Sequence, residues 1–345
     1  MQRLMQLGRE QRFASYCLFF TLVFDMNATS AQQPESFSTP QAAGAAPGRY
    51  PGASFLASEL PCPLGAIPVP GHEFFTLKRP GRTLKKYVFI QDDPFLLPKV
   101  LDKYLREFGD STMGINVQPS TQGKRTLVQT AMELLKMYGP RYFQWKLRNF
   151  IWKKIQGKVV NGIMGSTATC HTVAAVAKKY NVAVDYTEDV NSQAFRDMLK
   201  ARGVEFIVSI SGTMLYKKDL RMQTPFGIVN CHGALLPKYR GLMPSFWTLA
   251  NDEKIGGSSV HYVDRKLDNG PIVVQKKYRI HSHDRLEDIM SRSKDLAAEA
   301  IIECVRLVES GEPPMMDNPE AEQTHFHMPS KEDVERFKRA GHRFF

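Results

Sequence analysis

Residues 171–231 read HTVAAVAKKYNVAVDYTEDVNSQAFRDMLKARGVEFIVSISGTMLYKKDLRMQTPFGIVNC, and helical and strand patterns alternate along them. The patterns predict helices at 171–180, 192–202 and 215–222, and strands at 182–186, 206–210 and 227–231. Strands that alternate with helices are typical of a parallel sheet with helices on both faces. Residues 204–210, VEFIVSI, are apolar enough for a central strand. The sequence therefore predicts an α/β fold built on a mostly parallel sheet.

The alternation continues on both sides of this segment. Upstream, the expected elements are a strand at 85–91 (KKYVFIQ), a helix that begins at the acidic, proline-bearing residues 92–94 and runs to 105, a strand at 114–117, and a helix over 127–157 with a break near 139–140. Downstream, they are strands at 258–263 and 271–280 and a helix at 285–309. We expect one folded domain over 81–311, followed by a C-terminal tail at 312–345.

The first eighty residues form a predicted disordered or targeting leader. Arginines at 3, 9 and 12 precede an apolar run at 13–24, which fits a signal peptide, an organellar targeting segment, or a start codon placed too far upstream of Met26. Residues 32–72 are rich in Pro, Gly, Ala and Ser, as in flexible linkers. The expected location is cytoplasmic, or organellar if the leader is genuine.

Composition excludes several classes of protein. An apolar content of 43% argues against global disorder, and no run approaches the roughly 18 apolar residues of a membrane-spanning helix. The five cysteines include no CxxC pair and offer no zinc-site spacing. There is no GxGxxG and no P-loop, so the usual phosphate-cradling nucleotide sites are not indicated. The net charge of +11 suits an anionic partner, although many enzymes are basic without one.

Polar residues gather at the ends of two predicted strands in the segment 226–271. Asn230 and His232 lie two apart at the end of one strand, so their side chains share a face. Asp268 lies in an Asp-Asn-Gly turn after the strand at 258–263. Open α/β sheets bind ligands at strand ends, although each residue alone would be read as a turn-stabilising polar group.

This segment resembles the formyltransferases that use N10-formyltetrahydrofolate, the family of methionyl-tRNA formyltransferase and the amino-sugar N-formyltransferases. The resemblance extends over about 87–311 and is sharpest at 208–272. It implies a Rossmann-like catalytic domain over 81–311. One departure is Ala234, where many members carry Ser. The motifs that carry the resemblance are Asn230-x-His232, Leu235-Leu236-Pro237-x-Tyr239-Arg240-Gly241, Pro244-x-x-Trp247 and Asp268-x-Gly270.

The resemblance also implies roles for single residues. Asn230 and His232 would donate hydrogen bonds to the oxyanion of a tetrahedral intermediate, and Asp268 would hold the imidazole and take part in proton transfer. The donor would be 10-formyltetrahydrofolate, and no metal is implied. The expected contacts to the donor come from Gly212, Met214, Ala234, Leu235, Leu236 and Pro237. Lys238 and Arg240 beside the site are candidate contacts to the acceptor or to folate carboxylates, or else solvated loop charges.

The expected activity is formyl transfer to a primary amine, with methionyl-tRNA or an amino-sugar nucleotide as acceptor. The basic and aromatic residues at 141–158 suit RNA, or else form an amphipathic helix packed on the core. Only about thirty-five residues follow the last long helix, which leaves no room for the β-barrel that tRNA formyltransferases usually add. Two alternatives remain open: a non-catalytic RNA- or partner-binding protein on the same fold, and a formyltetrahydrofolate hydrolase.

Other histidines give weaker signals. The pairs His281-x-His283 and His325-x-His327 have spacings that could ligate a metal, but each lacks a third partner nearby in sequence, so they are expected to be surface or core residues. His261 lies within a predicted strand and is expected to be structural, with a possible approach to the site.

Overall fold

The computed structural model describes residues 66–68, 75–77 and 82–345, with gaps at 92, 94, 119–131, 133–134, 136–138, 164–171, 188, 213 and 312. All described residues belong to one compact unit, Cys62–Phe345. The leader expected at 1–80 and the predicted helix before residue 139 therefore lie largely outside the described residues. Strands β1 (Ala66–Pro68) and β2 (Phe75–Leu77) form a small antiparallel pair.

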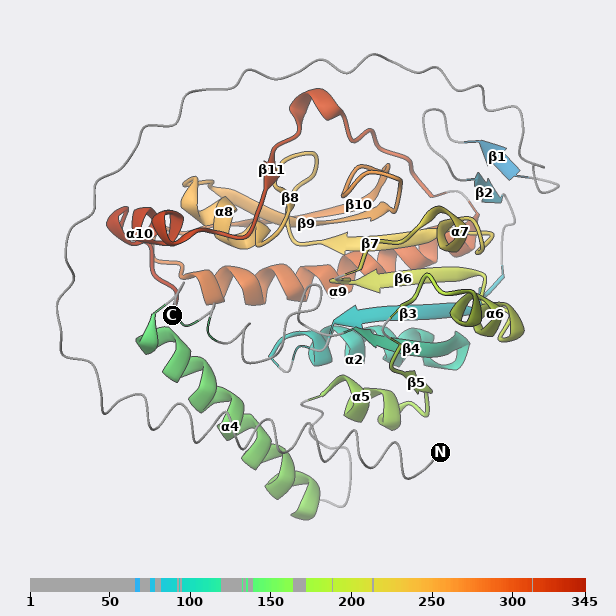
Figure 1. The fold of residues 1–345 in the computed structure, drawn as a ribbon, viewed down its shortest axis with the longest axis horizontal. Coiled ribbons are helices and arrows are strands. Elements are labelled where there is room, and N and C mark those ends of the chain that lie inside the picture. The colour runs from blue at the N-terminus through green and yellow to red at the C-terminus, as the bar shows by residue number, and fades with distance from the viewer. Residues whose placement is uncertain are drawn as a thin grey trace. The chain divides into compact units, whose positions relative to one another are not determined.

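A seven-stranded sheet forms the centre of the described unit, in the order β10-β9-β7-β6-β3-β4-β5 (Figure 1). Five strands run parallel, and β9 and β10 are antiparallel additions at one edge. The predicted α/β fold with a mostly parallel sheet is confirmed. The strands are β3 (Lys86–Gln91), β4 (Thr112–Gln118), β5 (Val184–Asp185), β6 (Phe206–Ile210), β7 (Ile228–His232), β9 (Ile255–Tyr262) and β10 (Ile272–Arg279).

Helices cover both faces of the sheet, because alternate residues of each strand point to opposite sides. Val88 and Ile90 of β3 join a cluster with residues of α2 (Leu97–Phe108), α5 (Val173–Lys179) and α9 (Leu286–Ser310). On the other face, Tyr87 and Phe89 pack against residues of α6 (Gln193–Ala201) and α7 (Lys218–Arg221). The two faces together bury the central strands completely.

Polar side chains fix where several helices begin. The Asp93 carboxylate accepts hydrogen bonds from the backbone N–H groups of Phe95, Leu96 and Leu97, so α2 starts there. Thr172 and Ser192 cap α5 and α6 in the same way. The helix predicted at 215–222 is shorter in the structure and comprises only the four residues of α7.

The C-terminal segment packs onto the sheet domain rather than leaving it. Strand β11 (His325–Phe326) pairs in parallel with β8 (Arg240–Gly241). Helix α10 (Lys331–Arg339) buries Val334 and Phe337 in a cluster with α8 (Pro244–Ala250) and the start of α9. Residues 312–345, expected to be a tail, thus lie directly over the loop that follows β7.

The basic and aromatic segment forms helix α4 (Pro140–Ile163), as its pattern predicts. Tyr142 is buried and donates a hydrogen bond to Glu287 on α9, and Lys146 forms an ion pair with the same carboxylate at 2.8 Å. Trp152 and Ile155 further along are exposed. The first half of the helix therefore packs on the domain through Tyr142 and Lys146. None of the helices in the described part of the chain is long and apolar enough to cross a membrane.

Candidate active site

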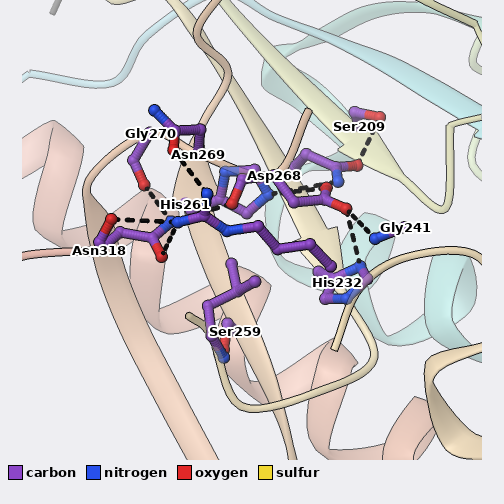
Figure 2. A network of polar contacts seen from close by, with 12 residues as sticks. Ser209, His232, Gly241, Ser259, His261, Asp268, Asn269, Gly270 and Asn318 are labelled. Carbon is purple, nitrogen blue, oxygen red and sulfur yellow. Dashed lines mark hydrogen bonds and ion pairs between the residues drawn. The ribbon is translucent and has the colours of Figure 1, made fainter. Parts of the chain in front are cut away.

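Two strands and one turn bring the polar residues of the site together. Asn230 and His232 end β7, and the antiparallel register of β9 places His261 opposite Asn230. Asp268 lies in the turn between β9 and β10 with a left-handed φ of 49°. Figure 2 shows Asp268 between the rings of His232 and His261. The three residues predicted from sequence thus converge, together with a fourth that was expected to be structural.

Distances define a small cluster around the Asp268 carboxylate. Its Oδ2 lies 3.6 Å from Nδ1 of His232 and accepts a hydrogen bond from the backbone N–H of Gly241 at 2.9 Å. Its Oδ1 lies 3.5 Å from Nε2 of His261, and the same Nε2 is 3.5 Å from Nδ2 of Asn230. His232 and Asp268 are almost fully buried. The carboxylate therefore touches both imidazoles.

Backbone carbonyls determine which ring nitrogen of each histidine carries a proton. Nε2 of His232 lies 2.7 Å from the carbonyl oxygen of Tyr239, and Nδ1 of His261 lies 2.8 Å from that of Tyr262. A carbonyl only accepts, so these two nitrogens are the donors. In the neutral rings, the nitrogens that face Asp268 are then unprotonated. Nδ1 of His232 is consequently a site where a proton can be taken up beside a carboxylate.

Burial and neighbouring charges set the protonation states. Burial lowers the pKa of His232, and the nearby Asp268 charge offsets only part of this effect, so the ring is neutral near pH 7. Burial alone would raise the pKa of Asp268, but the two histidines and the Gly241 N–H outweigh it and hold the pKa well below its usual range. Because His232 is neutral near pH 7, the hydrogen bond from the Gly241 N–H is the contact that favours the ionised carboxylate there. The site thus pairs a neutral imidazole with an ionised carboxylate.

The side chain of Asn230 is held in one orientation by β6. Ser209, which is fully buried, donates from Oγ to Oδ1 of Asn230 at 3.0 Å and also contacts the Tyr216 hydroxyl at 2.9 Å. Figure 2 shows Ser209 at the edge of the cluster. The amide nitrogen then faces His261, and no described residue accepts its second hydrogen. Since Asn230 is only half-buried, that N–H can donate to an incoming carbonyl oxygen.

The predicted donor-binding residues lie in two loops beside the cluster. The backbone of Gly212 lies close to the end of β6, and a Cβ there would lie 2.4 Å from Ser209 Oγ. Met214 is half-buried. Ala234 and Leu236 are buried, and Ser259 Oγ donates to the Ala234 carbonyl and accepts from the Leu236 N–H. Leu235 and Pro237 are half-buried, and the Leu236–Pro237 peptide bond is cis.

Arg240 differs from its predicted role as an acceptor contact. Its side chain is 1% exposed, and its guanidinium donates to Asn269, Asn318 and Gln323. The four hydrogens of its two terminal nitrogens are used within the protein, and Nε is buried without a partner among the described residues, so this guanidinium is not presented to an acceptor. Lys238 is exposed and lines a pocket of about 160 Å³ with Leu235, Tyr239, Thr248, Glu253, Ile255, Gly256 and Lys277.

Among the described residues, the remaining histidine pairs make no hydrogen bond or ion pair with Asn230, His232 or Asp268, although His325 pairs with Arg240, the neighbour of Gly241. His281 stacks on His283, and His325 makes an edge contact with His327. Across the residues that the structure describes, no group of three or more His, Cys, Asp or Glu side chains is placed to hold a metal ion.

Sequence reasoning undervalued His261 and missed Ser209. His261 shares a strand face with Ser259, which is the only signal that the sequence offers. Its place beside Asn230 depends on the register between β7 and β9, which no local pattern encodes. Ser209 lies within an apolar strand, where a lone hydroxyl is an unremarkable feature.

Comparisons with known proteins find similarity to formyltransferases in the middle of this chain. A family model described as formyl transferase matches residues 158–305. The methionyl-tRNA formyltransferase of Thermodesulfovibrio yellowstonii is 31% identical over 147 residues, which are 43% of this chain and 48% of that protein. That of Anaeromyxobacter dehalogenans is 33% identical over 137 residues, 40% and 44% of the two chains. This chain spans about half the length of the curated relatives it matches.

Solved structures show a weaker likeness. An N-formyltransferase from Helicobacter canadensis, described in complex with folinic acid and dTDP-3-aminofucose, has a TM-score of 0.45 and 13% identity over 74% of this chain and 80% of its own. These values are too low to assign a function to this chain from that structure. The sequence comparisons show that residues 158–305 are similar to formyl transferases, within a segment that makes up less than half of this chain.

Proposed function

We propose that the protein transfers a formyl group from 10-formyltetrahydrofolate to a primary amine, at a site within residues 81–311. The observation that supports this most is the convergence of Asn230, His232 and Asp268, with His261 in contact with Asn230 and Asp268. A non-catalytic binding protein would have no need for this cluster. The relatives described as methionyl-tRNA formyltransferases support the same reaction.

Attack of an amine on the formyl carbon creates an oxyanion, which needs a hydrogen-bond donor placed in advance. The second N–H of Asn230 can serve, because Ser209 and His261 fix the amide and leave that hydrogen available. One such donor contributes on the order of 10²–10³ in rate. Both ring nitrogens of His232 already face protein groups, so Asn230 is the better candidate for this role.

The attacking amine must also lose a proton. Nδ1 of His232 can take it up, directly or through water, because the ring is neutral and Asp268 lies 3.6 Å away. The ionised Asp268 would then stabilise the imidazolium by charge pairing. Asp268 and His232 together thus act as a proton acceptor, and no covalent nucleophile is required.

Recognition of the two substrates rests on the loops beside this cluster. We assign the donor to the loops at 211–217 and 233–237, which carry Gly212, Met214 and the segment from Ala234 to Pro237. Among the two predicted acceptor contacts, only Lys238 remains exposed for an anionic acceptor. Methionyl-tRNA and an amino-sugar nucleotide both carry phosphate, so both remain candidate acceptors.

Steady-state assays with 10-formyltetrahydrofolate and each acceptor test the proposal. Formyl transfer is expected with one acceptor at least, and Asn230→Ala and His232→Ala are expected to lower kcat by about 10² or more. His283→Ala, an exposed histidine away from the site, serves as the matched control. Transfer by both site variants at the wild-type rate would rule the proposal out.

Two further readouts separate the alternatives. Formate released without any acceptor would identify a hydrolase, since water can replace the amine at the same site. Salt-dependent RNA binding without folate binding would identify a binding protein instead.

A further inference from the structure

Asp268 sits in a turn whose backbone needs outside support. Its φ of 49° is in the left-handed region, which is costly for a residue with a side chain. Gly270 follows so close to β9 that a Cβ there would lie 2.0 Å from the Tyr262 carbonyl oxygen. The carboxylate reaches the two histidines at 3.5–3.6 Å, so a shift of the turn by less than an ångström would break these contacts.

The C-terminal segment supplies that support through Asn318. Its Nδ2 donates to the carbonyl oxygen of Asp268 at 3.0 Å and to that of Gly270 at 2.9 Å. Both hydrogens of one amide therefore bridge the two ends of the turn. Figure 2 shows Asn318 and Gly270 together on the side of the cluster away from His232.

Asn318 is itself held in place from two directions. Arg240 donates to its Oδ1 at 2.7 Å and to its backbone oxygen at 3.1 Å, and also to Oδ1 of Asn269 at 2.6 Å. Two residues earlier, Met316 pairs with Ile272 through two backbone hydrogen bonds of 2.9 Å. Each residue of the turn 268–270 thus contacts either Asn318 or the buried guanidinium.

We propose that Asn318 is a positioning residue, which holds the Asp268 carboxylate between His232 and His261 so that it can stabilise the protonated imidazole. This role rests on the proposed function, because it matters for catalysis only if His232 and Asp268 handle the proton. It assigns part of the active-site geometry to a segment 50 residues downstream of Asp268, outside the predicted catalytic domain.

Two variants distinguish positioning from general support. Asn318→Ala removes both hydrogen bonds to the turn, and Asn318→Ser keeps one donor. Gln323→Ala is the matched control, because Gln323 lies in the same segment and accepts from Arg240 but does not touch the turn. Asn318 is half-buried, so water can reach the freed carbonyls and the variants are expected to fold.

The first measurement is an NMR titration of ring-labelled histidine without substrates, with the His232 signal identified by its loss in His232→Gln. The charged or titratable groups that act on His232 are Asp268, which raises its pKa, and His261 and Lys294, which lower it; the hydrogen bond to the Tyr239 carbonyl also raises it. Asn318→Ala is expected to move the His232 midpoint to lower pH, with Asn318→Ser between it and wild type and Gln323→Ala unchanged. A titration identical to wild type in Asn318→Ala, or an equal shift in Gln323→Ala, overturns the proposal.

The second measurement is kcat/KM for formyl transfer, expected to fall about 10- to 100-fold in Asn318→Ala and to stay near wild type in Gln323→Ala. The two measurements fail separately. A His232 shift in a protein that transfers no formyl group supports the positioning geometry and refutes the proposed function. Transfer by wild type without a His232 shift in Asn318→Ala refutes the positioning role alone.

Discussion

Asp268→Asn separates the charge of the carboxylate from its shape. In the structure, Oδ2 accepts from Gly241 N–H and Oδ1 faces Nε2 of His261. An amide oxygen in the place of Oδ2 can still accept from Gly241, and the amide nitrogen can donate to His261, whose Nε2 is unprotonated in the neutral ring. The substitution therefore keeps the local hydrogen bonds and removes the charge beside His232.

The structure gives the size of both effects. A hydrogen bond to a charged group is worth about 1.5–3 kcal/mol and a neutral one about 0.5–1.5, so the free energy of unfolding at pH 7 should fall by only about 1 kcal/mol. Catalysis should suffer far more, because general acid–base assistance contributes about 10²–10⁴ in rate. We expect kcat/KM to fall by at least about 10².

The free energy of unfolding should also depend on pH differently in wild type and in Asp268→Asn. The pKa of Asp268 is depressed in the folded state, so its stabilising contribution is fully present above the unfolded value of about 3.9 and is lost as the pH falls below it. The stability gap between wild type and Asp268→Asn should therefore stay constant down to about pH 5 and narrow as the pH falls from there to about 2.

Urea unfolding across this range and steady-state formyl transfer measure both quantities. Wild-type kcat/KM in the variant would refute the role of the charge. A loss of more than about 3 kcal/mol at pH 7 would refute the assigned proton positions, because the amide would then lack its partners.

Three further substitutions test other parts of the site. Ser209→Ala frees the Asn230 amide to rotate and is expected to lower kcat/KM about tenfold at a stability cost of about 1 kcal/mol; kinetics at wild-type level would contradict the orienting role. His232→Gln keeps a donor for the Tyr239 carbonyl. Because burial lowers the pKa of His232, wild type should lose stability as the pH falls below about 6.5, and the variant should lack that part of the slope in urea unfolding, whereas parallel curves would contradict this. Arg240→Lys replaces the several N–H donors of a guanidinium by one ammonium and should lower the free energy of unfolding by about 2–3 kcal/mol, against about 1 kcal/mol for Gln323→Ala. Equal losses in the two variants would show that the guanidinium contributes no more to stability than its single contact with Gln323.

The sheet was readable from sequence because its central strands are buried on both faces. Residues 206–210 form β6 with the predicted bounds. A short apolar run between turn residues is typical of a strand buried on both faces. The edge strand β5 has two residues instead of the expected five, because an edge strand needs no continuous apolar run. Helix α7 begins only at Lys218, three residues later than the pattern predicts.

The site was readable only in part, and the reason lies in the kind of contact that builds it. Asn230 and His232 share a strand, so their common face follows from the alternation of side chains. His261 reaches them through an antiparallel register. Arg240 appeared to be a loop charge, but the C-terminal segment covers it, and no pattern around residue 240 encodes that pairing.

The motif after β7 acts on the cluster mainly through its backbone. The Tyr239 carbonyl fixes the proton on Nε2 of His232, and the Gly241 N–H holds the Asp268 carboxylate. These contacts depend on the path of the chain, which is why the spacing of the motif is informative although its side chains were hard to interpret. At Gly241 that path has a φ of 96°, and a Cβ would lie 2.2 Å from the Phe326 carbonyl oxygen of β11. A side chain there would therefore disturb both the C-terminal strand pairing and the acid of the site, whereas the exposed side chain of Lys238 can vary without moving either.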